Sequence, residues 1–372
     1  MRILFSCRPA YGHLFPLVPL ARAAQHAGHE VVFAIGPGFV EKARELGFEA
    51  HASGISIAEA EAEARRRHGD AEVPRLMITM FADVLPRATV RDLGGLLPRI
   101  KPDLVVYEQS DTGAAKAARD AGIPFVSHVI GRSMPPAIQE MAAGEMAWMW
   151  EGAAPADLML GDVVVDLWPD TVRDPVVAAL PTVLRQRPTA FDLDVPMPEV
   201  STTKPLVYLT LGTVSFGRTE VLRKAVDGLS RLPVNVLVAV GPGDPAVLGD
   251  VPANVRVAGF VPQAEVLQRA DLVVHHGGTG TVLGTLAAGL PQLVLPQGAD
   301  QFVNADVLAE TGAGAKLVGP EVTADAVTEA AGRLLDDPAA REVAGKVRSE
   351  IADMPDPAAV VQGLMELVRG TV

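Results

Sequence analysis

The chain has 372 residues, of which 49% are hydrophobic and 21% charged, and its formal net charge is -13. This length exceeds that of one ordinary domain, and the composition is typical of a globular protein and not of a disordered chain. The excess of acidic residues argues against nucleic acids and anionic membranes as partners, because both would repel the chain. A single cysteine, Cys7, excludes an internal disulfide and a cysteine-cluster metal site.

The chain opens with a pattern typical of a βαβ unit. The predicted strand "RILFSC" leads through the turn "RPAYGH" into the predicted helix "LFPLVPLARAAQHAG", and the strand "HEVVFAIG" follows. Two strands joined in this way are expected to be parallel, with the helix packed across them. Because polar residues and prolines interrupt the apolar N-terminus, we do not interpret it as a signal peptide.

No stretch reaches the roughly 18 uninterrupted apolar residues of a membrane-spanning helix. We therefore expect a cytoplasmic protein with no stable membrane insertion.

The same alternation continues in "PDLVVYEQSD", "TGAAKAARDAG" and "IPFVSHVIG". Strands this apolar are typical of a parallel sheet covered on both faces. After these elements, the segment "EMAAGEMAWMWEGAAPADLML" is rich in methionine and tryptophan. Two interpretations stay open for it: an amphipathic helix that packs on its own domain, and the wall of an apolar ligand pocket.

A stretch rich in proline and acidic residues, "RQRPTAFDLDVPMPEVSTTKP", indicates a domain boundary. After it, strands and helices alternate again. We predict an N-terminal domain over residues 1–187, a linker over 188–205, a C-terminal domain over 206–354, and a terminal helix within 355–372 that packs back on the first domain. The predicted fold class is α/β, with two facing Rossmann-like domains and an interdomain cleft.

Four candidate site residues each follow an apolar strand: His13, Glu108, Gly212 and His276. Ligands of open parallel sheets bind beyond the carboxyl ends of the strands. This shared placement predicts that the four residues belong to one site.

The stretch "HHGGTGT", at the point where a strand turns into a helix, predicts an anion site. Its backbone N–H groups and the helix dipole attract negative charge, and the glycines allow close approach. The natural ligand is a phosphate or diphosphate. Neither a Walker loop nor a dinucleotide fingerprint has this sequence at this place.

The segment of residues 260–314, which begins "FVPQAEVLQRADLVVHHGGTGT" and contains "PQGADQ", resembles the nucleotide-sugar signature of the inverting natural-product glycosyltransferases with the two-domain GT-B fold. The resemblance extends more weakly to "AYGHLFPLVPLA" and "LTLGT", and the similarity of layout covers nearly the whole chain. It implies an enzyme similar to bacterial macrolide and polyketide glycosyltransferases, which moves a sugar from a nucleotide diphosphate to an acceptor.

The resemblance also implies roles for individual residues in binding the donor. Phe260 matches an aromatic residue that stacks on the nucleobase, Val261 offers its backbone to the base edge, and Gln263 belongs to the same turn. The residues that match the diphosphate site are His276, Gly278, Thr279, Gly280 and Thr281, together with Gly212 and Thr213. Asp300 and Gln301 match a pair that binds hydroxyls of the donor sugar, whereas a structural place is expected for His275.

Removal of the acceptor proton requires a base, and His13 is the candidate. A neutral imidazole accepts a hydroxyl proton at cytoplasmic pH. The resemblance favours Glu108 as the residue that orients His13, with Asp111 in reserve, and the alternative is that His13 merely caps the helix that follows.

The sequence shows no suitably placed D-x-D motif, so we expect no metal and no cofactor beyond the nucleotide-sugar co-substrate. Relatives that use UDP-sugars commonly carry a glutamate at the position of Gly284, which accepts hydrogen bonds from the ribose hydroxyls. Glycine at this position predicts a dTDP-sugar. The expected acceptor is a hydrophobic aglycone, and a homodimer stays open.

Three other functions are compatible with parts of the pattern. A sugar-nucleotide 2-epimerase shares the fold and the diphosphate site. A non-catalytic relative would bind the nucleotide sugar or assist a partner transferase, but the retained His13, Asp300 and Gln301 argue against it. A lipid-linked transferase would require a glycine-rich first loop and a basic surface, which this chain lacks.

Overall fold

The computed structural model describes residues 1–69, 71–150, 157–191, 194–212 and 219–370. The chain divides into two compact units. The first comprises residues 1–167, 174–186 and 355–372, and the second comprises residues 168–173 and 187–354. Residues 168–173 therefore differ from the predicted boundaries, which place them in the N-terminal domain.

Within the described residues, the first unit is built on a seven-stranded parallel sheet with the strand order β3-β2-β1-β4-β5-β6-β7. Its strands are β1 (Arg2–Cys7), β2 (Glu30–Ile35), β3 (Glu49–Ala52), β4 (Leu104–Glu108), β5 (Phe125–Val129), β6 (Val163–Asp166) and β7 (Thr182–Arg185). The central strands β1 and β4 are buried along almost their whole length. Burial on both faces explains why they are apolar runs and not alternating patterns.

The helices of this unit are α1 (Tyr11–Leu14), α2 (Val18–His26), α3 (Val40–Glu45), α4 (Ile57–His68), α5 (Val73–Thr79), α6 (Leu85–Ile100), α7 (Thr112–Asp120), α8 (Pro136–Met146), α9 (Pro175–Ala178) and α16 (Pro357–Gly370). Shorter helical turns are η1 (Phe15–Leu17), η2 (Pro37–Phe39), the π-turn η3 (Met80–Val84) and η4 (Ala147–Met149). The predicted turn after β1 thus already contains most of α1, and the helix predicted from Leu14 is divided into the end of α1, η1 and α2. Pro16 and Pro19 explain the division, because proline has no N–H to donate to the preceding turn.

The methionine-rich segment begins within α8 and continues through η4, and its residues 151–156 lie outside the described residues. Met146 and Met149 are buried in an apolar cluster with Ile78 and Leu158 of the same unit. The packing interpretation therefore holds for these two methionines, whereas Met141 on the same helix is 47% exposed.

The second unit, in the part that the structure describes, has a six-stranded parallel sheet with the order β10-β9-β8-β11-β12-β13. Its strands are β8 (Leu206–Thr210), β9 (Asn235–Ala239), β10 (Val255–Ala258), β11 (Leu272–His275), β12 (Gln292–Val294) and β13 (Gly314–Lys316). Its helices and turns are η5 (Asp170–Val172), α10 (Thr219–Ser230), η6 (Pro245–Leu248), α11 (Gln263–Leu267), α12 (Thr279–Ala288), α13 (Gln301–Thr311), η7 (Gly319–Glu321), α14 (Ala324–Asp336) and α15 (Pro338–Asp353). The predicted fold class, two α/β domains with parallel sheets, is confirmed.

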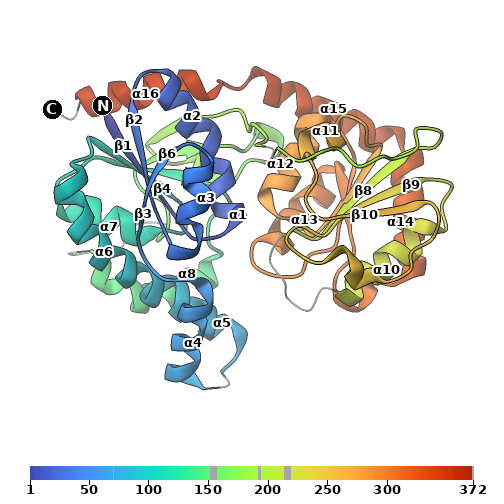
Figure 1. The fold of residues 1–372 in the computed structure, drawn as a ribbon, viewed down its shortest axis with the longest axis horizontal. Helices are drawn as coiled ribbons and strands as arrows, with labels where there is room; N and C mark the ends of the chain where they lie inside the picture. The colour runs from blue at the N-terminus through green and yellow to red at the C-terminus, as the bar shows by residue number, and fades with distance from the viewer. Residues whose placement is uncertain (70, 151–156, 192–193, 213–218, 371–372) are drawn as a thin grey trace. The chain divides into compact units, whose positions relative to one another are not determined.

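The last helix, α16, belongs to the first unit and not to the second, which precedes it in the chain. It packs against α2, and Figure 1 shows the red α16 beside the blue α2. Val360, Val361 and Leu364 form its buried face. Among the helices that the structure describes, none is long and apolar enough to cross a membrane.

Candidate active site

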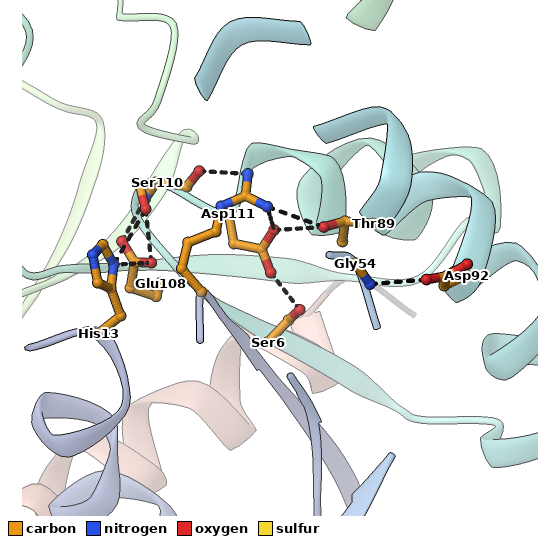
Figure 2. Close-up of polar contacts among 9 residues, drawn as sticks. Ser6, His13, Gly54, Thr89, Asp92, Glu108, Ser110 and Asp111 are labelled. Carbon is orange, nitrogen blue, oxygen red and sulfur yellow. Dashed lines mark hydrogen bonds and ion pairs between the residues drawn. The ribbon is translucent and has the colours of Figure 1, made fainter. Parts of the chain in front are cut away.

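Two predicted catalytic residues meet at the carboxyl ends of β1 and β4. Glu108 is the last residue of β4, and His13 lies in α1, which follows β1. Nδ1 of His13 is 2.7 Å from Oε2 of Glu108, and Figure 2 marks this contact with a dashed line. The carboxylate is fully buried, whereas 26% of the His13 side chain is exposed. The pair thus has one buried member and one that reaches the surface of the unit.

The charge of Glu108 determines which ring nitrogen of His13 carries the proton. Burial raises the pKa of Glu108, but the neighbouring His13 and the hydrogen bonds from His13 and Ser110 outweigh it, so the pKa is lowered. An ionised carboxylate only accepts hydrogen bonds, so Nδ1 of His13 must donate. In the neutral ring, Nε2 then carries the lone pair that a general base requires.

The alternative in which His13 caps a helix does not fit this geometry. Helix α1 already begins at Tyr11, with Ala10 as its N-cap residue, and His13 lies in its last turn. The side chain of His13 instead contacts Glu108.

Asp111, the reserve partner of His13, is held elsewhere. Its carboxylate accepts hydrogen bonds from Ser6 Oγ at 2.6 Å and Thr89 Oγ1 at 3.1 Å. It also pairs with Nη1 of Arg8 at 3.1 Å, and both side chains are almost completely buried. Glu108, and not Asp111, therefore contacts His13. The sequence reasoning missed Arg8, because only the fold shows that it points inward.

In the second unit, the loop between β11 and α12 encloses the ring of His276. A Cβ atom added to Gly278 would lie 2.5 Å from Nε2 of His276, and one added to Gly212 would lie 2.6 Å from its Cε1. Gly212 also has a φ of 78°, which disfavours other residues. The structure thus brings together Gly212, His276 and Gly278, as the sequence predicts, and both glycines are needed for space. Thr213 lies outside the described residues.

His275 is a structural residue of this loop, as expected. It is fully buried; its Nδ1 accepts the N–H of Gly277 at 3.0 Å, and its Nε2 lies 2.8 Å from Oε1 of Gln292. Burial lowers its pKa to about 4. The neutral ring that donates from Nε2 and accepts at Nδ1 satisfies both contacts.

The first turn of α12 is tied to α13 by Asp300. Oδ2 of Asp300 accepts hydrogen bonds from Thr279 Oγ1 and Asn304 Nδ2, both at 3.2 Å. Asn304 also donates to the carbonyl of Gly277 at 2.9 Å. The sequence reasoning missed Asn304, although its place one helical turn after Asp300 was a usable signal. Gly280 in the same turn is exposed, and Thr281 is partly buried.

Gln301 is buried, and its amide oxygen is already occupied. Oε1 accepts the N–H groups of Gln297 at 2.9 Å and Gly298 at 3.2 Å. We therefore expect the predicted contact with a sugar hydroxyl to be made by the amide nitrogen, Nε2.

The predicted base-binding residues lie between β10 and α11. The side chain of Val261 is buried in the apolar core of the second unit, which agrees with a role for its backbone alone. Phe260 is partly exposed. Helices α11 and α12 are in contact, and Gln263 and Leu267 of α11 face Gly284 of α12. The predicted base-binding segment therefore leads into a helix that packs on α12, the helix that follows the glycine loop.

The described residues contain no group of three or more histidine, cysteine, aspartate or glutamate side chains arranged to hold a metal ion.

The architecture of the two units is that of the GT-B glycosyltransferases. The crystal structure of the glycosyltransferase SnogD from Streptomyces nogalater superposes with a TM-score of 0.81, at 28% identity and over 99% of each chain. The glycosyltransferase SsfS6 from Streptomyces sp. SF2575, complexed with thymidine diphosphate, superposes with a TM-score of 0.80 at 27% identity, over 98% of this chain and 99% of that one.

Sequence comparison identifies the family. Residues 223–367 match the family described as Erythromycin biosynthesis protein CIII-like, C-terminal domain. The L-demethylnoviosyl transferase of Streptomyces niveus is 32% identical, over 98% of this chain and 97% of its own. The chain therefore belongs to the natural-product glycosyltransferases with the GT-B fold, which confirms the family that the sequence resemblance predicts.

Proposed function

We propose that this protein transfers a deoxysugar from a dTDP-sugar to a hydroxyl of a hydrophobic natural-product aglycone, with inversion at the sugar and with His13 as the general base. The observation that carries the proposal is the hydrogen bond between His13 and the buried carboxylate of Glu108. It leaves Nε2 of a partly exposed imidazole able to accept a proton.

In the proposed reaction, Nε2 of His13 removes the proton of the acceptor hydroxyl. The hydroxyl oxygen attacks the anomeric carbon of the donor sugar and forms the new glycosidic bond. The bond from that carbon to the diphosphate breaks, and dTDP leaves with the electron pair. Attack from the opposite face inverts the anomeric configuration. Glu108 stabilises the imidazolium that forms, as a buried carboxylate does in other dyads.

The departing diphosphate gains negative charge, and the glycine loop supplies positive partners for it. The N-terminus of α12 directs backbone N–H groups and the helix dipole at the loop, and the His276 ring lies beside its glycines. Fixed dipoles of this kind stabilise developing charge without a divalent cation. We therefore propose metal-independent transfer, in which activity survives EDTA.

Two observations support a thymidine nucleotide, and a third supports an apolar acceptor. Gly284 has no side chain to bind a ribose 2′-hydroxyl, and SsfS6 was solved with thymidine diphosphate. In the first unit, Val73 on α5 and Met141 on α8 are large apolar side chains that stay exposed, and the two helices are in contact. Exposed apolar side chains on these two neighbouring helices are available to contact a hydrophobic aglycone.

Replacing the base tests the proposal. His13→Ala should lower kcat by about 10²–10⁴-fold, the usual contribution of a general base, while calorimetry shows unchanged dTDP affinity. His51→Ala is the matched control, because His51 also pairs with a glutamate, Glu49, but on an exposed part of the unit; it should leave kcat unchanged. Glu108→Gln should lower kcat more than Asp111→Asn does.

Other results would contradict the proposal. A parallel loss of dTDP affinity in His13→Ala would make His13 a donor-site or folding residue. Consumption of the sugar nucleotide without an acceptor would identify an epimerase. Nucleotide binding without turnover against a broad aglycone panel would identify a helper protein.

A further inference from the structure

Ser110, two residues after β4, makes more contacts to the Glu108 carboxylate than any other residue in the described contacts. Its backbone N–H donates to Oε1 at 2.6 Å, and its hydroxyl donates to Oε2 at 2.8 Å. The hydroxyl oxygen also lies 3.3 Å from Nδ1 of His13. Figure 2 shows the serine above the point where Glu108 and His13 meet.

We propose that Ser110 is a positioning residue of the active site, which fixes the Glu108 carboxylate in the orientation that His13 requires. This inference rests on the proposed function of His13 as the base. Three donors hold the carboxylate: the ring N–H of His13 and the two groups of Ser110. Without the serine hydroxyl, Oε2 keeps only the bond to His13 among these, and the carboxylate gains freedom to rotate.

Ser110 is itself held by a buried ion pair. Its carbonyl accepts a hydrogen bond from Nη2 of Arg8 at 3.0 Å, and Nη1 of the same guanidinium pairs with Asp111, the next residue, at 3.1 Å. Buried charges are stable only when they are paired and hydrogen-bonded. The pair therefore fixes the backbone on the C-terminal side of Ser110, and the serine presents its hydroxyl at a set place.

Loss of the hydroxyl should change the acid–base behaviour of Glu108. Hydrogen bonds to the charged form lower the pKa of a carboxyl group, and both bonds from Ser110 act in this direction on Glu108. Removing one donor should therefore raise the pKa of Glu108. The carboxylate would then take up a proton at a higher pH and cease to orient His13.

The other titratable and charged groups around Glu108 come from α1, β1, β5 and the start of α7: His13, Cys7, His128, and the ion pair of Arg8 and Asp111. Burial lowers the pKa of His128 to about 4, and burial raises the pKa of the Cys7 thiol well above its usual value. Both are therefore uncharged between about pH 5 and 8. Because the pKa of Glu108 is lowered from its usual value, Glu108 titrates below this range, where His128 also takes up its proton. A probe on the Glu108 carboxyl carbon itself is therefore needed to separate the two titrations.

The experiment compares Ser110→Ala with Ser6→Ala. Ser6 is a matched control: it is also a buried serine whose hydroxyl donates to a carboxylate, at 2.6 Å, but its partner is Asp111. Carbon-13 NMR of labelled glutamate carboxyls follows the titration of Glu108, whose resonance is assigned by its loss in Glu108→Gln. Initial rates against pH give the acidic limb of kcat.

In Ser110→Ala we expect the Glu108 titration midpoint to rise by roughly half a pH unit or more. The plateau of kcat, above its acidic limb, should fall several-fold with little change in the acceptor KM. Ser110→Thr, which keeps the hydroxyl, should restore both the midpoint and the plateau. Ser6→Ala should move neither. If Ser110→Ala does not fold, Ser110→Cys, with its weaker donor, should show the same shift.

An unchanged Glu108 midpoint in the folded Ser110 variant, or an equal shift in Ser6→Ala, would overturn the assignment. The NMR titration separates this inference from the proposed function. A wild-type protein that transfers no sugar would refute the function, while the effect of Ser110 on Glu108 would still be measured.

Discussion

Gly284 is the residue at which we expect the choice of nucleotide to be decided. It lies on α12, where a Cβ atom would be 3.2 Å from Cδ1 of Leu267 and 3.4 Å from Nε2 of Gln263. A glutamate here would accept hydrogen bonds from ribose hydroxyls, and a deoxyribose would leave it partly unsatisfied. An unsatisfied buried acceptor costs about 1–3 kcal/mol. We therefore predict that kcat/KM for one sugar is higher on dTDP than on UDP, and that Gly284→Glu moves this ratio toward UDP by tenfold or more.

Gly284→Ala and Gly284→Gln are the controls for this experiment. The alanine introduces the contact with Leu267 but no ribose partner, so it should lower both kcat/KM values together. Gly284→Gln has nearly the same volume as Gly284→Glu but no charge, so comparing the two variants shows what the charge contributes. A clear preference of the wild-type protein for UDP would refute the argument.

The sequence predicted the main residues of both parts of the site but not the residues that hold them. His13 and Glu108 were predictable because the carboxyl ends of parallel strands meet at one edge of a sheet. Arg8 and Ser110 were not, because arginine and serine are ordinarily exposed, whereas the place of Asn304 one helical turn after Asp300 was a usable signal. Only the fold shows Arg8 to be 2% exposed and paired with Asp111.

At the scale of elements, the loop before α12 depends on two glycines that leave room for an imidazole. In Gly278→Ala, the new methyl group would lie 2.5 Å from Nε2 of His276, so the ring must move. We predict that this variant weakens dTDP binding at least tenfold, because the diphosphate loses a charge-assisted partner worth about 1.5–3 kcal/mol. Isothermal titration calorimetry measures the change.

Gly280→Ala is the matched control in the same helix turn. A Cβ atom there meets nothing within 4 Å, and alanine favours a helix by about 1 kcal/mol over glycine. The variant should raise Tm slightly and weaken dTDP binding less than Gly278→Ala. Equal binding losses in the two variants would show that His276 is not the group displaced.

The elements themselves were predicted unequally. Apolar strands with turn residues at both ends could be predicted from the sequence. Between residues 55 and 99, in contrast, the apolar residues follow no regular spacing, and the described part of this segment contains α4, α5, η3 and most of α6. The π-turn of η3 inserts an extra residue between α5 and α6 and shifts the apolar repeat. A search for one continuous 3.6-residue period misses such a break.

At the scale of the whole molecule, two buried histidines predict that the protein loses stability in mild acid. Burial lowers the pKa of His128 in the first unit and of His275 in the second to about 4. The unfolded chain takes up these protons below about pH 6.5, whereas the folded chain does so only near pH 4. The free energy of unfolding is therefore unaffected by these two histidines above about pH 6.5, and it falls as the pH drops toward 4. The expected loss between pH 7 and 5 is about 2 kcal/mol per histidine.

Urea unfolding at several pH values measures this loss. Both ring nitrogens of His128 are buried without a hydrogen-bond partner in the described part of the chain. His128→Leu should therefore cost little at pH 7 and should flatten the pH dependence of the transition of the first unit. The transition of the second unit should be unaffected. A variant whose stability falls with pH as steeply as that of the wild type would contradict this assignment.

The return of α16 to the first unit has a consequence for biosynthesis. The ribosome makes residues 168–173 and 187–354 before α16. All residues of the second unit are therefore synthesised before the last helix of the first unit. Domains ordinarily fold in the order in which they emerge, but here the unit that starts first is completed last. Until α16 emerges, the apolar surface of α2 that it covers stays available to chaperones. A nascent chain that stalls after residue 354 would thus carry a complete second unit attached to an unfinished first unit.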